Sequence, residues 1–475
     1  MNPNNFTQLL LDDFPYSVTD SQRTLIIALS HFILDPGDRK LFILKGYAGT
    51  GKTTVVGSLV KNLRHVERNA VLLAPTGRAA KVLTSYSGTK AYTIHKHIYM
   101  LTTGIDGSLK LTLAFNKYRN CIFIVDEASM IPDSSGSNDS SFFSSRNLLE
   151  DLINYVYSGK NCKLILIGDT AQLPPVGIDE SPALNLDYLK NSFHLDIETF
   201  ELREVVRQAL DSGILTNATL LRQALEKNSV EFNLVTGQFS DIIRINGTEL
   251  EDQLNNAFSV SGIGETVVIT RSNKRANIFN REIRNRILFH EGEISTGDYL
   301  MVVRNNYFWI DKKSPTGFIA NGDILEIMKI MKYEELYGFR FADIMVRLTD
   351  YPEEKDLTVK ILLDTISSDG PALTSADNRR LFDEIMKDYD EIPSKRSRMD
   401  KVKNNPYFNA LQVKYAYALT CHKTQGGQWE RVFIDQGYLT DEQINKEYSR
   451  WLYTAVTRAT SVLYLVNFNE KFFTK

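Results

Sequence analysis

The chain has 475 residues, a hydrophobic fraction of 43%, a charged fraction of 24% and a formal net charge of −3. This length suits about two to four globular domains with large cores. The nearly balanced charge provides no general basic surface for nucleic acid, so such a partner would require basic groups gathered on one face or in a channel.

The sequence shows no sign of membrane insertion or secretion. It contains no run of about 18 or more apolar residues, and its first residues lack a basic stretch followed by an apolar one. The three cysteines, Cys121, Cys162 and Cys421, are an odd number in apolar surroundings and are not spaced as zinc ligands. We therefore expect a reduced, cytoplasmic protein with buried thiols, no membrane contact and no structural metal.

The first half alternates short apolar runs with helical patterns. A Thr19-Asp20-Ser21-Gln22 capping box begins a helix, and helical patterns also cover Thr53–Leu63 and Arg78–Leu83. The apolar runs are Leu41–Leu44, Val71–Ala74, Ile122–Val125 and Leu164–Ile167. Because these runs are continuous rather than alternating, they predict strands buried on both faces of a parallel sheet. This order is typical of a doubly wound α/β domain, with a surface loop over Ser134–Arg146.

The second half repeats this pattern more loosely around a different kind of segment. Val267–Thr270, Val432–Ile434 and Val462–Val466 are candidate strands of a second sheet. Between them, Tyr299–Val303, Ile324–Ile327, Ile344–Leu348 and Val359–Leu363 are short strands separated by turn residues, which predicts a small inserted β-barrel. We expect the domains to span residues 1–195, then 196–328 with 406–475, and the insertion with a charged helical segment to span 329–405.

A phosphate-binding loop follows the first strand. Gly46-Tyr47-Ala48-Gly49-Thr50-Gly51-Lys52-Thr53 matches the G-x-x-x-x-G-K-[ST] pattern between a strand and a helix. Its glycines let backbone N–H groups face phosphate oxygens, and the helix presents its positive end. Lys52 is expected to reach the β- and γ-phosphates and Thr53 to bind Mg²⁺. The predicted nucleotide-binding residues of this loop are Gly46, Gly49, Gly51, Lys52, Thr53 and Thr54.

Two further motifs lie just past predicted strand ends. Asp126-Glu127-Ala128-Ser129 follows Ile122–Val125, so Asp126 is expected to bind Mg²⁺ and Glu127 to act as general base. An isolated pair of this kind would be a solvated turn, but the phosphate loop upstream favours the catalytic interpretation. Gln172, in the Gly168–Val176 segment, is placed to contact the γ-phosphate. Ligands bind open α/β sheets at the edge where these motifs meet.

Two arginines outside the first domain are candidates for offsetting charge on the γ-phosphate. They are Arg207, in Val206-Arg207-Gln208, and Arg458, in Val456-Thr457-Arg458-Ala459. Either one taken alone could be a surface salt bridge. If both reach the nucleotide, it lies in a cleft that opens and closes between two lobes.

This ordered set of motifs, completed by Thr420-Cys421-His422-Lys423-Thr424-Gln425-Gly426, resembles superfamily 1 helicases. Within that superfamily the chain is most similar to the 1B branch, which contains the petite integration frequency (Pif-type) helicases and their RecD and Dda relatives. The resemblance extends from about Thr19 to Phe468, and His422–Gly426 with Gln172–Val176 are its most specific segments.

The resemblance implies an α/β fold with two RecA-like P-loop domains and a small SH3-like β-barrel inserted in the second. It implies a motor that uses ATP and Mg²⁺, translocates 5′→3′ on single-stranded DNA and acts at single-strand/duplex junctions, with G-quadruplexes and RNA–DNA hybrids as further substrates. Because both predicted lobes lie in one chain, we expect the motor to be a monomer. Gln22 is expected to read the adenine edge. The implied DNA contacts are Pro75, Thr76, Gly77, Arg78, Thr93, His95, Lys96, Thr420, His422, Lys423 and Gln425, mostly to phosphate and sugar.

Several alternatives remain open at this point. In relatives the region matching His97–Asn120 carries a wedge hairpin, so Tyr99 or Phe115 is expected either to stack on a base or to pack in the core. The segment before Gly168 lacks the long signature of eukaryotic members, which favours a bacterial or phage-type protein, and the residues after Gly426 leave the ribose contact unassigned. The sequence does not distinguish a DNA helicase from an RNA unwinder. A non-motor scaffold is disfavoured because Lys52, Glu127 and Arg458 are intact.

Overall fold

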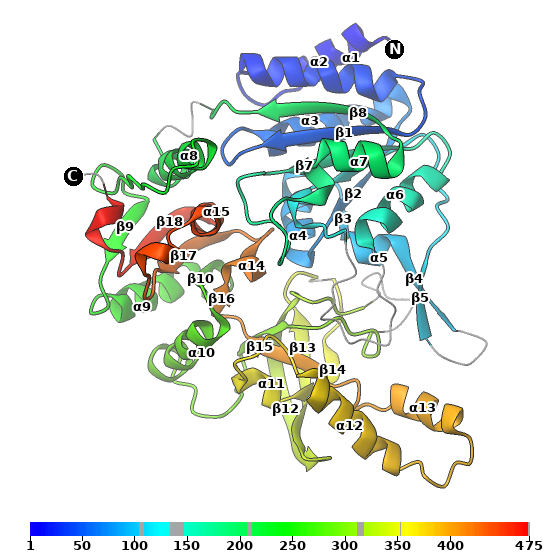
Figure 1. Cartoon of the computed structure of the whole chain (residues 1–475), viewed down its shortest axis with the longest axis vertical. Helices are drawn as coiled ribbons and strands as arrows, with labels where there is room; N and C mark the ends of the chain where they lie inside the picture. The colour runs from blue at the N-terminus through cyan, green and yellow to red at the C-terminus, as the bar shows by residue number, and fades with distance from the viewer. Residues whose placement is uncertain (104–108, 134–146, 207–210, 311–317, 352, 474–475) are drawn as a thin grey trace.

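The computed structural model describes residues 1–103, 109–133, 147–206, 211–310, 318–351 and 353–473. Figure 1 shows two α/β lobes side by side, with a β-barrel and its helices below them. The lobes carry one parallel sheet each, and the barrel is inserted in the second lobe. The expected fold of two RecA-like lobes with a barrel insertion is therefore confirmed. The predicted loop at 134–146 lies outside the described residues.

The first lobe is built on a six-stranded, fully parallel sheet. Its strands, in spatial order, are β3 (Ala91–Thr93), β2 (Asn69–Ala74), β6 (Cys121–Val125), β7 (Lys163–Gly168), β1 (Lys40–Gly46) and β8 (Asp196–Leu202). All four predicted strands of this half are present. Because β8 pairs along its length with β1, the first lobe extends beyond the expected boundary at residue 195.

Helices cover both faces of this sheet, because alternate strand residues point to opposite sides. One hydrophobic cluster joins the sheet to α1 (Pro3–Asp12), α2 (Asp20–Leu34), α3 (Lys52–Asn62) and α4 (Gly77–Ser87). A second cluster joins the other face to α5 (Ile94–Ile98), α6 (Leu148–Ser158) and α7 (Leu186–Phe193). The capping box predicted at the start of α2 is present, with Thr19 and Gln22 bonded reciprocally. The predicted helices beginning near Thr53 and Arg78 are α3 and α4.

A β-hairpin projects from the first lobe between α5 and β6. Its strands are β4 (Tyr99–Thr103) and β5 (Leu109–Leu113), which pair antiparallel with Tyr99 opposite Leu113. In Figure 1 the hairpin extends from the first lobe on the side that faces away from the second lobe.

The second lobe contains a five-stranded parallel sheet. Its strands, in spatial order, are β16 (Ala418–Thr420), β10 (Thr266–Thr270), β17 (Trp429–Asp435), β18 (Ala459–Val466) and β9 (Ile242–Ile245). Its helices are α8 (Gly213–Glu226), α9 (Leu250–Ser261), α10 (Asn273–Glu282), α14 (Cys421–Thr424) and α15 (Lys446–Val456). The helix α15 lies on the side of this sheet nearest the first lobe. Its side chains therefore form the second lobe's wall of the cleft between the lobes.

The inserted barrel starts earlier and ends later in the sequence than expected. It closes through β11 (Tyr299–Val302), β12 (Ile324–Leu336), β13 (Phe339–Leu348), β14 (Leu357–Leu362) and β15 (Leu411–Tyr415). The expected limits of 329 and 405 are therefore wrong: β11 pairs with both β12 and β15, so the barrel cannot close without these outer strands. The charged segment predicted as helical forms α12 (Ser375–Lys387) and α13 (Lys395–Lys403), after the short α11 (Asp364–Ser367).

The three cysteines are buried and unpaired, as expected. Among the described residues, no helix is both long enough and apolar enough to cross a membrane.

Candidate nucleotide cleft and nucleic-acid interface

The phosphate-binding loop joins β1 to α3 at the carboxyl edge of the first sheet. Gly49 and Gly51 have φ angles of 73° and 80°, a left-handed conformation that favours glycine. The Lys52 ammonium donates hydrogen bonds to the carbonyl oxygens of Gly46 and Tyr47 at 2.6 and 2.8 Å. The loop therefore has the shape of a phosphate cradle, with the lysine folded against the loop's own backbone.

Gln22 lies against this loop although it is distant in sequence. Its Oε1 accepts a hydrogen bond from the Thr19 backbone at 3.1 Å, and its Nε2 donates to the Thr50 carbonyl at 3.2 Å. A Cβ atom at Gly51 would lie 2.3 Å from Gln22 Nε2, so only glycine allows this approach. The capping box thus fixes the glutamine beside the cradle, and its contact with adenine stays a prediction.

The acidic pair follows β6 at the same sheet edge. Asp126 Oδ2 accepts a hydrogen bond from the Tyr86 hydroxyl at 2.5 Å, and Asp126 Oδ1 accepts one from the Glu127 backbone at 2.9 Å. Glu127 has a φ of 52°, and a non-glycine residue in this region stores strain of the kind that gathers at active sites. Burial raises the pKa of Glu127 to about 7, while the nearby Arg458 opposes this shift.

Arg458 crosses from the second lobe to this acidic pair. Its Nη1 lies 3.9 Å from Glu127 Oε1, and its side chain is almost fully buried. Three further bonds hold the guanidinium, to the carbonyl oxygens of Thr454 and Gly427 and to the Thr457 hydroxyl. Lys52 and Arg458 therefore both lie near Glu127, and the catalytic roles of the three residues stay predictions. The other candidate, Arg207, lies outside the described residues.

The two lobes are joined beside the cradle by Tyr453 of α15. Its hydroxyl donates to Asp169 Oδ2 at 2.6 Å and accepts from the Ala48 backbone N–H at 3.1 Å. At the next residue of the helix, the Thr454 hydroxyl accepts a hydrogen bond from the Leu173 backbone N–H at 2.9 Å. The sequence analysis assigned no role to Tyr453, because nothing local in Leu452-Tyr453-Thr454 shows that this face of the helix meets the other lobe.

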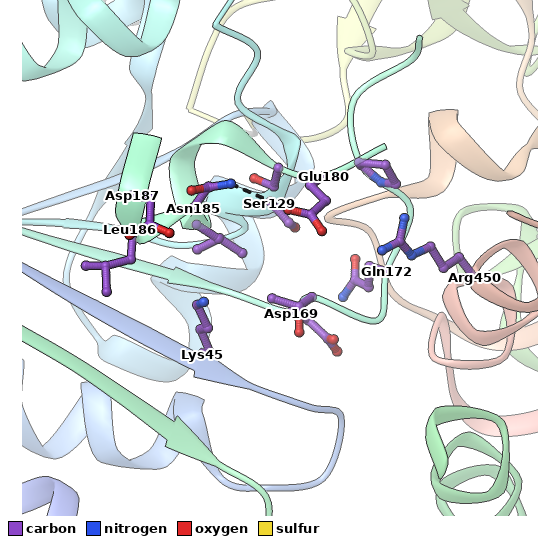
Figure 2. A pocket seen from close by; sticks show the side chains of 13 residues that line it. Lys45, Ser129, Asp169, Gln172, Glu180, Asn185, Leu186, Asp187 and Arg450 are labelled. Carbon is purple, nitrogen blue, oxygen red and sulfur yellow. Dashed lines mark hydrogen bonds between the residues drawn. The ribbon is translucent and has the colours of Figure 1, made fainter. Parts of the chain in front are cut away.

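Gln172 lines a cavity of about 340 Å³ whose other walls include Lys45 at the end of β1, Asp187 of α7 and Arg450 of α15. Figure 2 shows Lys45 and Asp169 on one side of this cavity and Arg450, from α15, approaching Gln172 on the other. Among the described residues, Gln172 Oε1 and Ser129 Oγ are buried without a hydrogen-bond partner. Buried polar atoms usually have partners, so these two are available to a ligand or to water.

The first predicted DNA-contacting segment is the start of α4. Thr76 caps the helix by accepting a hydrogen bond from Ala79, next to the half-buried Pro75. Arg78 points toward the second lobe: its Nη2 donates to the Gln428 carbonyl at 2.8 Å, and its guanidinium lies 4.0 Å from the centre of the Trp429 ring. In this structure Arg78 is therefore a contact between the lobes, and its DNA contact stays a prediction.

The second predicted DNA-contacting segment is covered by the barrel. Thr93 is buried and caps α5, and the adjacent His95 packs against the Tyr99 ring. Lys96 Nζ lies 3.8 Å from Asp323 Oδ2 and 3.9 Å from the centre of the Tyr351 ring. Burial raises the pKa of Asp323 to about 6, although Lys96 opposes this shift. Asp323 and Tyr351 of the barrel therefore contact the Lys96 ammonium, which is the group that would bind DNA.

The third predicted segment begins at Thr420 and forms α14 in the second lobe. His422 is half-buried, and burial lowers its pKa. Lys423 Nζ donates to Asn321 Oδ1 at 2.8 Å. Gln425 is buried and donates to the Leu173 carbonyl at 2.6 Å, so it joins the lobes in this structure. The DNA roles of these residues stay predictions.

The two wedge candidates occupy different environments. Tyr99 is buried and donates a hydrogen bond to Asp151 at 2.7 Å, so it packs in the core. Phe115, just past the hairpin, is 76% exposed and remains available to stack on a base.

Comparisons with known proteins agree with this geometry. Family models match an AAA domain at residues 19–240 and a UvrD-like helicase C-terminal domain at residues 415–466. The ATP-dependent DNA helicase dda of Enterobacteria phage T4 is 26% identical over 82% of this chain and 86% of its own length. The RecD2 DNA helicase of Deinococcus radiodurans is 31% identical over 38% of this chain and 21% of its own length.

A solved structure of the Pif1 helicase from Candida albicans aligns over 97% of both chains, with 15% identity and a TM-score of 0.46. A Bacteroides Pif1 in complex with ADP-AlF3 and ssDNA aligns over 97% of this chain and 95% of its own, with 15% identity and a TM-score of 0.42. The nucleotide motifs meet in one cleft between two RecA-like lobes, and the family models cover parts of both lobes. The chain therefore matches an AAA domain model in its first lobe and a UvrD-like helicase C-terminal model in its second, and it is similar to the dda helicase along most of its length.

Proposed function

We propose that the chain is an ATP-dependent DNA helicase that moves 5′→3′ on single-stranded DNA and separates the strands at single-strand/duplex junctions. The observation that carries this proposal is the 3.9 Å approach of Arg458, in the second lobe, to Glu127, in the first. A nucleotide site completed by both lobes links hydrolysis to movement of one lobe against the other. Such movement is what a motor on nucleic acid requires.

The residues of the cleft fit ATP with Mg²⁺. The cradle offers backbone N–H groups and the amino-terminal end of α3. Gln172 and Ser129 present polar atoms that have no hydrogen-bond partner within the ranges the structure describes. Thr53 and Asp126 offer oxygen ligands of the kind that Mg²⁺ prefers. When bound, MgATP supplies the phosphoanhydride bond and a metal charge that screens its phosphates.

The chain's own groups then have distinct tasks. Lys52 leaves the carbonyl oxygens of its loop and binds phosphate oxygens. Glu127 takes the proton of the attacking water, and its raised pKa suits a general base near neutral pH. Arg458 offsets negative charge that grows in the transition state. Because Arg458 belongs to the second lobe, it reaches the nucleotide only when the cleft is closed.

The proposal is tested by steady-state ATPase activity with and without single-stranded DNA, using the wild type and Glu127→Gln. We expect strong stimulation by DNA and its loss in the variant, which keeps the size of the side chain but cannot accept the proton. Equal turnover with and without DNA would refute the motor. Stimulation by single-stranded RNA in place of DNA would favour an RNA unwinder.

Polarity and substrate range need separate substrates. Duplexes with a single 5′ or 3′ overhang distinguish the two directions, and unwinding of only the 5′-tailed duplex is expected. G-quadruplex and RNA–DNA hybrid substrates with the same 5′ tail test the wider range that the family resemblance implies.

A further inference from the structure

The loop Gly426–Trp429 lies between the start of α4 and Arg458. It follows α14 and leads into β17, so it belongs to the second lobe. One side of this loop contacts the first lobe at a predicted DNA-binding helix. The other side is bonded to the arginine that reaches Glu127. No role was assigned to Trp429 by the sequence.

The contact with α4 is unusually close because it is made by glycine. A Cβ atom at Gly426 would lie 2.8 Å from Ala79 Cβ and 3.2 Å from Thr76 Oγ1. Arg78 then closes over the loop, with its guanidinium stacked on Trp429 at 4.0 Å and bonded to the Gln428 carbonyl at 2.8 Å. A half-buried cation on an aromatic face is held electrostatically, so a movement of Arg78 is transmitted to the loop.

The contact with Arg458 is made at two points. Arg458 Nη1 donates to the Gly427 carbonyl at 3.1 Å. The Trp429 backbone N–H donates to the Arg458 carbonyl at 3.0 Å. The loop thus holds both the guanidinium and the backbone of the residue whose Nη1 lies 3.9 Å from Glu127 Oε1.

We propose that Trp429 is a positioning residue that couples DNA occupancy at α4 to the placement of Arg458 at the nucleotide. DNA that engages the start of α4 shifts Arg78 on the indole ring, and the loop passes this shift to Arg458. The inference rests on the proposed helicase function, but it assigns DNA stimulation of ATPase activity to a specific contact. Trp429 itself touches neither ATP nor the reacting atoms.

The first experiment compares Trp429→Leu with the wild type in ATPase assays over a range of single-stranded DNA concentrations. We expect turnover without DNA to stay within about twofold, and maximal stimulation to fall about tenfold, within the range of a typical coupling between sites. The DNA concentration giving half of the maximal effect should change by less than about threefold. Trp429→Phe keeps an aromatic face and should restore part of the stimulation.

The control is Trp309→Phe, which changes a barrel tryptophan bonded to the Asn409 carbonyl and should leave stimulation unchanged. Failure of DNA to stimulate the wild type would overturn the proposed function itself. If the wild type is stimulated and Trp429→Leu is stimulated equally, only the coupling inference fails. It also fails if the variant loses DNA affinity alone, or loses basal and stimulated activity in the same proportion.

A second experiment does not depend on altering Trp429. The chain has three tryptophans, so Trp309→Phe with Trp451→Phe leaves Trp429 as the sole indole. In the described part of the chain, Trp451 Nε1 has no hydrogen-bond partner to lose. Single-stranded DNA should change Trp429 emission with the same concentration dependence as ATPase stimulation in this protein. Constant emission during full stimulation would overturn the inference.

Discussion

The hydroxyl of Tyr453 provides a direct test of how the cleft between the lobes is held closed. Tyr453→Phe removes one oxygen atom, which donates to Asp169 and accepts from Ala48. The bond to the carboxylate is worth about 1.5–3 kcal/mol and the bond from the backbone amide about 0.5–1.5 kcal/mol. Water can replace both hydrogen bonds when the lobes separate, so the loss of about 2–4.5 kcal/mol destabilises the closed form.

This loss shifts the equilibrium toward the open cleft by roughly 30- to 2000-fold. Because Arg458 meets Glu127 only in the closed form, we expect kcat/KM for ATP at saturating single-stranded DNA to fall at least about 30-fold. The matched control is Tyr448→Phe on the same helix, whose hydroxyl interacts with Gln436 inside the second lobe. A Tyr453→Phe enzyme with kcat/KM within about threefold of wild type would refute this account of closure.

Three other substitutions test separate parts of the structure. Lys163→Met removes an ammonium that donates to two carbonyl oxygens at the end of α2, at 2.5 and 2.6 Å, and should lower Tm by about 5 °C or more in calorimetry; an unchanged Tm would contradict this. Burial lowers the pKa of His97 to about 4 from 6.5, so stability is lost as pH falls through that window, by up to about 3 kcal/mol. His97→Phe should flatten the fall of Tm over this range, and an equally steep fall would exclude His97 as its cause. Asp323→Asn removes the carboxylate near Lys96 and should tighten single-stranded DNA binding about fivefold, as measured by fluorescence anisotropy. Unchanged or weaker binding would show that the barrel does not compete with DNA for Lys96.

The nucleotide motifs were predictable because each one is local. A buried strand followed at once by a glycine-rich or acidic segment places Gly46, Asp126 and Gln172 at one sheet edge, whatever the rest of the chain does. Arg458 was a candidate on general grounds, and the family resemblance favoured it over a surface arginine, which no local pattern does.

Contacts between the lobes were not predictable, because they depend on how two separately folded units meet. Tyr453 lies in an ordinary amphipathic helix pattern and Trp429 in an ordinary strand pattern. The side chains of Arg78 and Gln425 can donate hydrogen bonds to DNA or to a protein carbonyl oxygen equally well. The barrel limits were wrong for a related reason. The outer strands β11 and β15 are short and pair with each other across more than 100 residues, so the sequence near each strand does not show its partner.

The attachment of the barrel has a mechanical consequence. Its last strand, β15, ends at Tyr415, and β16 of the second lobe begins at Ala418. Ala416 is bonded to β11 of the barrel, and the Tyr417 carbonyl is bonded to β10 of the second lobe. A load on the barrel therefore has a direct covalent path of two residues to β16 and α14, where the candidate DNA-binding segment of the second lobe begins.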